Sequence, residues 1–178
     1  MSRTPKPARA LLLSLAMIGT LLTIGASSAA AAPATWSATG PLSVRGPLTL
    51  TRPAISTTIN CDMMLSIGAS AGSSTFSGTP SPSPCGTPYN GSFTMMPHGS
   101  AQLNAGNYSL SFNSIVQQYF GSLGYYVPGA FTVPFTNGSG STPSRVTFNN
   151  THIGSGIYAT GTLNVTKMSP PGSLVTLN

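Results

Sequence analysis

Few side chains in this 178-residue sequence could act as acids, bases or nucleophile activators. The only carboxylate side chain belongs to Asp62, and the only imidazoles belong to His98 and His152. Acid–base catalysis usually needs a positioned carboxylate or histidine, so a Ser-His-Asp triad here would have to use Asp62. Glycoside hydrolysis by paired carboxylates needs two acids and is excluded. We therefore expect a protein that is not an enzyme.

Methionines next to histidine raise the question of a metal. The sequence contains Met-Met-Pro-His at 95–98 and Met-Met at 63–64. Thioether and imidazole ligands suit copper, but methionine more often fills gaps in a protein core, and no ligand spacing here is diagnostic. A calcium site would need several carboxylate oxygens. We expect no metal and no cofactor.

Cys61 and Cys85 are the only cysteines, and they stand 24 positions apart. In an oxidising compartment they are expected to pair. The residues between them are mostly small, polar or turn-forming, so we expect the disulfide to close a flexible Ser/Gly/Pro loop at about 68–90 onto a sheet. Prolines in this stretch lack an N–H donor, which argues against a central strand there. Loop-closure entropy predicts a stabilisation of about 3 to 4 kcal/mol.

The N-terminus has the pattern of an export signal. Three basic residues precede an apolar run at 10–24, and small residues follow it. We expect residues 1–32 to be a signal peptide, cleaved after Ala30 or Ala32. The run is shorter than the roughly 20 residues of a spanning helix, so we expect no membrane span after cleavage. The protein is expected to be secreted, periplasmic or at the surface of a bacterial cell.

Residues 33–178 are long enough for a single domain with its own core. This part carries one acid and four cations, so its net charge is +3, while the whole chain carries +6. The four cations are Arg45, Arg52, Arg145 and Lys167. Such scattered cations do not form a phosphate-neutralising patch, and nucleic-acid binding is not expected.

Alternating apolar and polar residues recur along the domain, with Gly, Pro and Asn between the runs. This pattern predicts short antiparallel strands. The clearest runs are 42–52, 55–67, 108–112, 145–148 and 157–167. We expect an all-β domain with one disulfide, either an antiparallel sandwich (immunoglobulin-like or jelly-roll-like) or a small barrel. A transmembrane barrel also alternates, but prolines inside several candidate strands disfavour it.

Two kinds of interaction surface are expected from the strand pattern. Pro134 predicts an edge position for the strand Phe131 to Phe135. A second edge strand is predicted at Leu174 to Leu177. Either edge could pair with a neighbouring copy of the chain, so that the protein self-associates. A cluster of aromatic side chains could instead form an exposed apolar surface or fill the core. Its members are Tyr119, Phe120, Tyr125 and Tyr126.

Two stretches resemble the activators of alkane oxidation, the PraB-like family of small exported proteins. Residues 131–167 resemble the closing segment of that family: an Asn-rich turn, a Val-Thr-Phe-Asn-Asn strand at 146–150, a glycine turn, and Gly-Thr-Leu-Asn-Val-Thr at 161–166. Residues 59–85 are similar to its arrangement of a cysteine, an apolar strand, a Ser/Gly-rich segment and a second cysteine.

The resemblance implies an exported, non-catalytic accessory protein that acts at the cell surface or at an oil–water interface. Its expected partners are hydrocarbons or components of the cell surface. The alternative that we carry forward is a structural or adhesive surface subunit, of the fimbrial or matrix type.

Overall fold

The computed structural model describes residues 30–86, 91–120 and 123–178, and their side chains except those of residues 91, 114–120 and 123–128. These residues form antiparallel strands and one short 3-10 turn, η1 (Pro53–Ile55). The strands are β1 (Ala32–Pro33), β2 (Gly40–Arg52), β3 (Thr57–Ala69), β4 (Thr75–Thr79), β5 (Ser81–Cys85), β6 (Gly91–Met96), β7 (His98–Asn104), β8 (Asn107–Phe120), β9 (Leu123–Thr136), β10 (Ser144–Gly154) and β11 (Ile157–Lys167). No helix among them is both long and apolar enough to cross a membrane.

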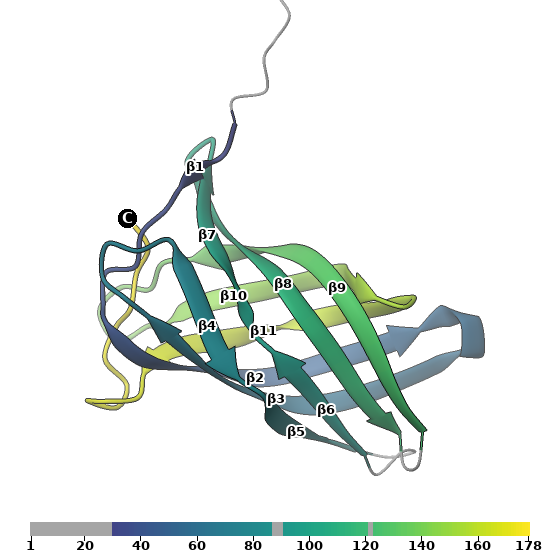
Figure 1. The fold of residues 1–178 in the computed structure, drawn as a ribbon. Coiled ribbons are helices and arrows are strands. Elements are labelled where there is room, and N and C mark those ends of the chain that lie inside the picture. Colours follow the sequence, from purple (N-terminus) through teal and green to yellow (C-terminus); the bar gives the residue numbers. More distant parts are fainter. Residues whose placement is uncertain (1–29, 87–90, 121–122) are drawn as a thin grey trace, which may run out of the picture.

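The strands close into an eight-strand barrel (Figure 1). Around the barrel, β2 pairs with β3, β3 with β4 and β5, β4 with β7, β5 with β6, and β6 and β7 with β8, after which β8 to β11 pair in chain order and β11 pairs with β2 to close the circle. Of the two predicted architectures, the small barrel is therefore confirmed, and no sandwich forms. Closure removes the long free edges that an open antiparallel sheet would expose.

Two positions in the barrel are each filled by a pair of short strands. β4 and β5 follow one another along β3, interrupted at Pro80, while β6 and β7 follow one another along β8, interrupted at Pro97. Strands β4 and β5 lie within the loop predicted at about 68–90, and β5 contradicts the expectation that prolines exclude a central strand there. The prolines of β5 are accommodated because their rings face outward while Ser83 between them faces the core.

The barrel interior is an apolar core made by alternate residues of the strands. Leu42, Val44, Leu65 and Val165 are among the side chains that are almost fully buried. Aromatic rings run through this core: Phe112 stacks on Phe131 with ring centroids 5.0 Å apart, and further phenylalanines continue the contacts at 5.1 and 5.9 Å. The predicted alternation of strand residues is thus confirmed as an inside–outside pattern.

A close approach of β2 and β11 needs two glycines. A β-carbon on Gly46 would lie 2.6 Å from the carbonyl oxygen of Thr162, and one on Gly161 would lie 2.4 Å from that of Pro47. Both glycines have φ 156°, which L-residues rarely adopt. β2 continues through Gly46-Pro47 as one strand that packs tightly on β11.

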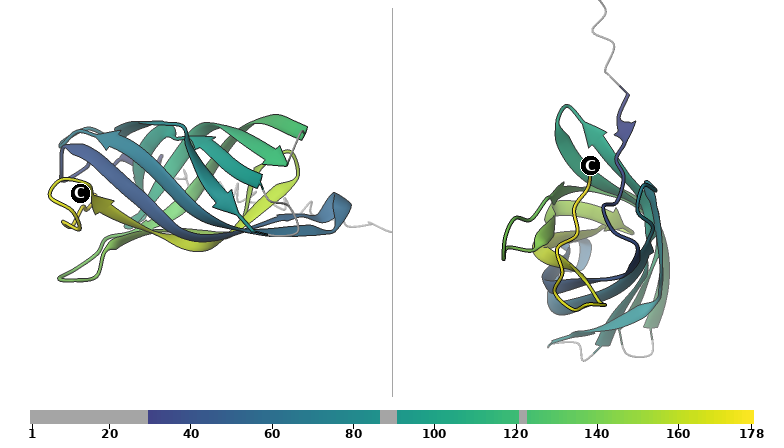
Figure 2. Two further views of the ribbon diagram at one scale, coloured as in Figure 1. Left: turned by 90° about the horizontal axis from the view of Figure 1, so that it is seen from below. Right: turned by 90° about the vertical axis from the view of Figure 1, so that its left-hand side faces the viewer.

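The segment 34–38 and the C-terminal segment lie together at one end of the barrel (Figure 2). Thr35 and Asn178 exchange two backbone hydrogen bonds of 3.0 and 2.9 Å, and Ser37 N–H donates to Thr176 at 2.9 Å. Trp36, 1% exposed, packs edge-on against Phe76 and Phe135. The lone tryptophan of the sequence therefore fills this part of the core.

Neither predicted edge strand is a free edge. The segment Phe131–Phe135 lies in β9 between β8 and β10, with Phe135 paired to both Tyr108 and Val146. Pro134 is tolerated there because its side chain lies on the exposed face of the sheet, opposite Ser109. Leu174–Leu177 forms no regular strand.

The C-terminal segment is held mainly by side chains. Asn137 both donates to the Leu177 carbonyl (2.8 Å) and accepts from the Leu177 N–H (2.7 Å). The buried hydroxyl of Ser144 donates to the Val175 carbonyl and accepts from Gly138 N–H. The apolar side chains of Val175 and Leu177 are thereby kept in the core.

Candidate functional site

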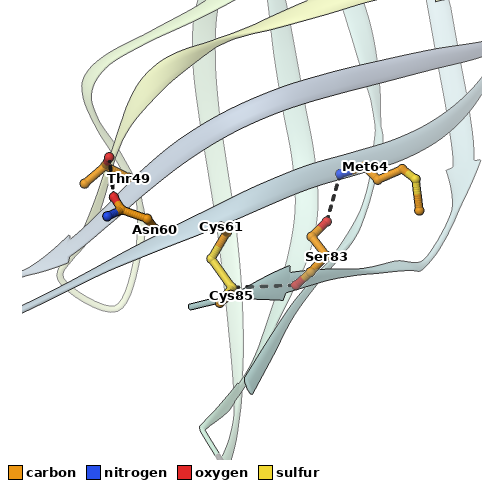
Figure 3. The surroundings of a disulfide bond; sticks show 6 residues. All are labelled: Thr49, Asn60, Cys61, Met64, Ser83 and Cys85. Carbon is orange, nitrogen blue, oxygen red and sulfur yellow. Dashed lines mark hydrogen bonds between the residues drawn. A yellow bond between two sulfur atoms is a disulfide. The ribbon is translucent and has the colours of Figure 1, made fainter. Parts of the chain in front are cut away.

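The disulfide predicted from the sequence forms between Cys61 of β3 and Cys85 of β5 (Figure 3). The two cysteines are direct partners across the strands, with their Cα atoms 4.0 Å apart. Cys61 faces the core, as expected from the alternation that begins at Ile59. A disulfide here is compatible with an extracellular or periplasmic location.

The disulfide crosses a seam with little backbone pairing. Within the described residues, the β3–β5 ladder contains the single pair Cys61–Cys85, whereas every residue of β2 has a partner on the other side of β3. Pro82 and Pro84 of β5 have no N–H to donate. The Met64 N–H of β3 donates instead to the buried Ser83 hydroxyl at 2.9 Å (Figure 3). We call this the β3–β5 seam.

The candidate acid and bases are spread over the barrel. Asp62 lies on the outer face of β3, where its carboxylate is 3.8 Å from the Arg45 guanidinium and both side chains are more than half exposed. His98 on β7 lies level with Gly68 of β3. Gly68 is six residues from Asp62 along β3, which is a distance of about 20 Å at the rise of a β-strand. His152 on β10 accepts a hydrogen bond from Gly156 N–H at 3.3 Å and contacts the Tyr158 ring. The structure does not bring these three residues together.

Groups of three or more His, Cys, Asp or Glu side chains are absent from the part of the chain that the structure describes. The two Met-Met pairs are the candidate soft ligands. Because side chains alternate along a strand, the two methionines of each pair point to opposite faces of the sheet. Met63 and Met95 lie in the core at 1% and 2% exposure, whereas Met64 and Met96 point outward.

Three methionines are exposed on one part of the outer wall: Met64 (38%), Met96 (41%) and Met168 (46%). The Met168 sulfur accepts a hydrogen bond from the Ser66 hydroxyl at 3.6 Å. Ser66 is two residues from Met64 on the same face of β3, so their Cα atoms are about 7 Å apart. Met64 and Met168 are therefore neighbours on the surface although they are far apart in the sequence.

Met96 of β6 lies near the same part of the surface, on the side of β3 that faces β5 and β6. The β5–β6 ladder begins with Ser81 opposite Met95, so Met96 lies beside Pro80. Thr79, the residue before Pro80, is the partner of Ser66 on β3. Two strand spacings, about 10 Å, thus separate Met96 from Ser66. Pro80 and Pro82 are also exposed. We call the surface made by Met64, Met96, Met168, Pro80 and Pro82 the methionine face.

The wall around the methionine face is polar but almost uncharged. The outward positions of β3 and β4 are Ser, Thr, Asn and Gly, and Asp62 is the only acid of the whole sequence. Other large apolar side chains exposed in the described part of the chain are Ile55 and Leu174. Ile55 has no strand pairing with the methionine face, whereas Leu174 follows Ser173, whose carbonyl accepts from the Lys167 N–H next to Met168 at 3.1 Å. The face is therefore an apolar area on a weakly charged hydroxyl-rich surface.

An open groove lies elsewhere, at the β7–β8 hairpin. It has a volume of about 390 Å³ and is lined by Asn104, Ala105, Asn107, Tyr108, Ser109, Thr132, Val133 and Pro134. No charged side chain lines it. Its shape alone does not indicate a ligand.

The aromatic surface predicted from the sequence lies where side chains are not described. The backbones of Tyr119 and Phe120 end β8, and those of Tyr125 and Tyr126 begin β9, where they pair with Gln118 and Gln117. The side chains of all four are outside the described residues, so their predicted role as an apolar interaction surface stays a prediction.

The methionine face is the site that sequence reasoning missed, although the signal was present. Successive residues of a strand point to opposite sides of the sheet. Because Ile59 and Cys61 point inward, Met63 must follow them and Met64 must face outward. A Met-Met pair inside a strand therefore always exposes one thioether unless something else covers that face.

Comparison with other proteins adds no family: the chain matches no protein-family model, no curated protein and no solved structure. Function is therefore argued from the barrel's own surface and from the sequence resemblance described above.

Proposed function

We propose that this protein is an exported, non-catalytic accessory protein that adsorbs to an apolar–water interface at the cell surface. The observation that supports this proposal best is the methionine face. Three long thioether side chains lie exposed together on a wall that is otherwise weakly charged and hydroxyl-rich. Exposed apolar patches on small proteins frequently mark interaction sites.

Methionine suits a surface without fixed shape. Its unbranched side chain rotates freely about three bonds and its sulfur is polarizable, so it adapts to irregular apolar partners. At about 25 cal/mol per Å² of apolar surface removed from water, covering three partly exposed methionines contributes on the order of a few kcal/mol. That magnitude fits reversible adsorption.

The low charge of the outer wall supports the same proposal. Charged groups near an oil surface would lose hydration on adsorption, and this loss is costly. Close to the face, the described charges are the Arg45–Asp62 pair, which partly neutralise each other at 3.8 Å, and Lys167, the residue before Met168. The resemblance to activators of alkane oxidation suggests liquid hydrocarbon as the apolar phase.

The test is adsorption of the purified exported protein to hexadecane droplets of known total area. A triple variant, Met64→Gln, Met96→Gln and Met168→Gln, keeps similar side-chain length but makes the face polar. We expect its partition coefficient to fall about tenfold, which corresponds to about 1.4 kcal/mol. The control is Thr136→Gln, Asn149→Gln and Thr162→Gln, at exposed positions of β9, β10 and β11, which should adsorb like the wild type.

Equal adsorption of the methionine triple variant and the wild type, with matching melting curves, would rule out the methionine face as the adsorbing surface. Concentration-dependent polymers in sedimentation experiments, together with weak adsorption, would instead favour the structural or adhesive subunit.

A further inference from the structure

We propose that the methionine face is a modification site at which a hydroperoxide reversibly switches the surface from apolar to polar. This inference rests on the proposed function, because it concerns regulation of the same surface. It assigns Met64, Met96 and Met168 as the residues that are oxidised in the folded protein, and Met63 and Met95 as residues that are protected.

The reaction is an oxygen transfer that needs only the protein and the oxidant. A lone pair on the thioether sulfur attacks one oxygen of the hydroperoxide, an S–O bond forms and the O–O bond breaks. The sulfur is oxidised by two electrons to the sulfoxide, and the remaining oxygen leaves as water or an alcohol after taking up the proton. Methionine sulfoxide is reduced back to the thioether by methionine sulfoxide reductases, with a dithiol as the two-electron reductant and the oxygen leaving as water.

The strand alternation decides which sulfurs the oxidant reaches. Met63 and Met64 are adjacent in β3, yet one is 1% and the other 38% exposed. Met95 and Met96 repeat the arrangement in β6, at 2% and 41%. Oxidation susceptibility follows exposure, so each pair provides a reactive methionine and a protected internal reference.

The fold is arranged so that oxidation changes polarity without releasing structure. The Ser66 hydroxyl donates to the Met168 sulfur at 3.6 Å, and a sulfoxide oxygen is a stronger acceptor than a thioether sulfur. The turn after β11 is also tied by backbone bonds, from Met168 N–H to Pro41 and from Gly172 N–H to Lys167. Met64 and Met96 point away from the core, so their oxidation leaves the packing of the barrel unchanged.

The consequence is a polar, neutral face in place of an apolar one. Each sulfoxide adds a strong hydrogen-bond acceptor whose hydration must be lost when the surface is covered. Three sulfoxides on one small area therefore oppose adsorption at an oil surface, while the net charge of the protein does not change.

The experiment treats the purified exported protein with hydrogen peroxide and locates sulfoxide by peptide mass spectrometry. We expect oxidation at least about tenfold faster at Met64, Met96 and Met168 than at Met63 and Met95. Adsorption to hexadecane droplets should fall about tenfold and recover after incubation with both classes of methionine sulfoxide reductase and a dithiol reductant. Peroxide treatment should not change the adsorption of the triple variant Met64→Leu, Met96→Leu and Met168→Leu from its own untreated level, because this face holds no sulfur.

The outcomes separate this inference from the function on which it rests. If untreated protein does not adsorb, the proposed function fails whatever the oxidation pattern. If untreated protein adsorbs and full oxidation at the three exposed methionines leaves adsorption unchanged, the switch is wrong while the interfacial function survives. Oxidation of Met63 and Met95 at the same rate as their neighbours would also overturn the assignment.

Discussion

The two sides of strand β3 are held by different means. On the β2 side, every residue from Gly40 to Arg52 has a partner in β3, so hydrogen bonds are repeated along the whole strand. On the β5 side, prolines at 82 and 84 remove donors, and the described ladder consists of one residue pair. A disulfide, the Ser83 hydroxyl and one backbone bond, from Gly86 N–H to the Asn60 carbonyl at 2.9 Å, hold that side instead.

The difference indicates how a proline-rich sequence can be part of a closed barrel. A regular ladder tolerates the loss of one interaction because its neighbours remain, and its hydrogen bonds each contribute about 1 kcal/mol net. The β3–β5 seam has few interactions, so each of them should matter more. Measurements that remove one interaction at a time from both sides of β3 test this comparison.

The largest effect is expected from removing the disulfide. Reduction of Cys61–Cys85, or the double variant Cys61→Ala and Cys85→Ala, should lower the free energy of unfolding by about 3 to 4 kcal/mol, because the cross-link restricts a 24-residue separation in the unfolded chain. Urea denaturation with and without reductant measures it. As a control, reductant should not change the unfolding of the double variant. An unchanged transition for the reduced wild type would show that the seam holds without the bond.

The next largest effect is expected from Ser83→Ala. The hydroxyl is fully buried and accepts the Met64 N–H, so its loss leaves that donor without the partner described and should cost about 1 to 3 kcal/mol. The matched control is Ser77→Ala on the exposed face of β4, which should change stability by less than about 0.5 kcal/mol. Equal effects of the two variants in denaturant titrations would contradict the role given to Ser83.

Ser83→Ala also sharpens the comparison when it is combined with reduction. Both interactions hold the same seam, so their effects should not be additive, and the coupling energy should exceed about 0.5 kcal/mol. Additive effects would mean that the disulfide and the hydroxyl stabilise separate parts of the barrel.

Alternation in the sequence was enough to predict much of the barrel. The pattern Ile59, Cys61 and onward gives an inward face that the structure confirms, and the disulfide follows from two cysteines in a chain with an expected export signal. The choice between sandwich and barrel was left open, because local alternation is the same in both. What decides it is the pairing of β11 with β2, which depends on contacts between distant parts of the chain.

The prolines show why local rules failed between 68 and 90. Because Pro82 and Pro84 lack N–H donors, local rules predict that they do not lie in a central strand. They occupy one nevertheless, since both rings point outward and the missing bonds to β3 are offset by a cross-link and a side-chain acceptor. Such compensation involves residues about 20 positions apart and is not visible in a local window. Part of the candidate site, by contrast, could have been predicted from Met63-Met64.

The smallest effect is expected on the regular side of β3. Thr49→Ala removes a hydrogen bond of 2.8 Å from the Thr49 hydroxyl to the Asn60 side chain, across the ladder that joins β2 and β3. Because the pair is exposed and backbone bonds flank it, we expect a loss of less than about 1 kcal/mol, including the lower strand propensity of alanine. Thr58→Ala, also exposed on β3, is the control for propensity alone. Denaturant titrations give the loss of unfolding free energy of Thr49→Ala relative to Thr58→Ala, and of Ser83→Ala relative to Ser77→Ala. If the two differences are equal, the flanking bonds of the ladder do not compensate for the lost one. The contrast between the two sides of β3 then fails.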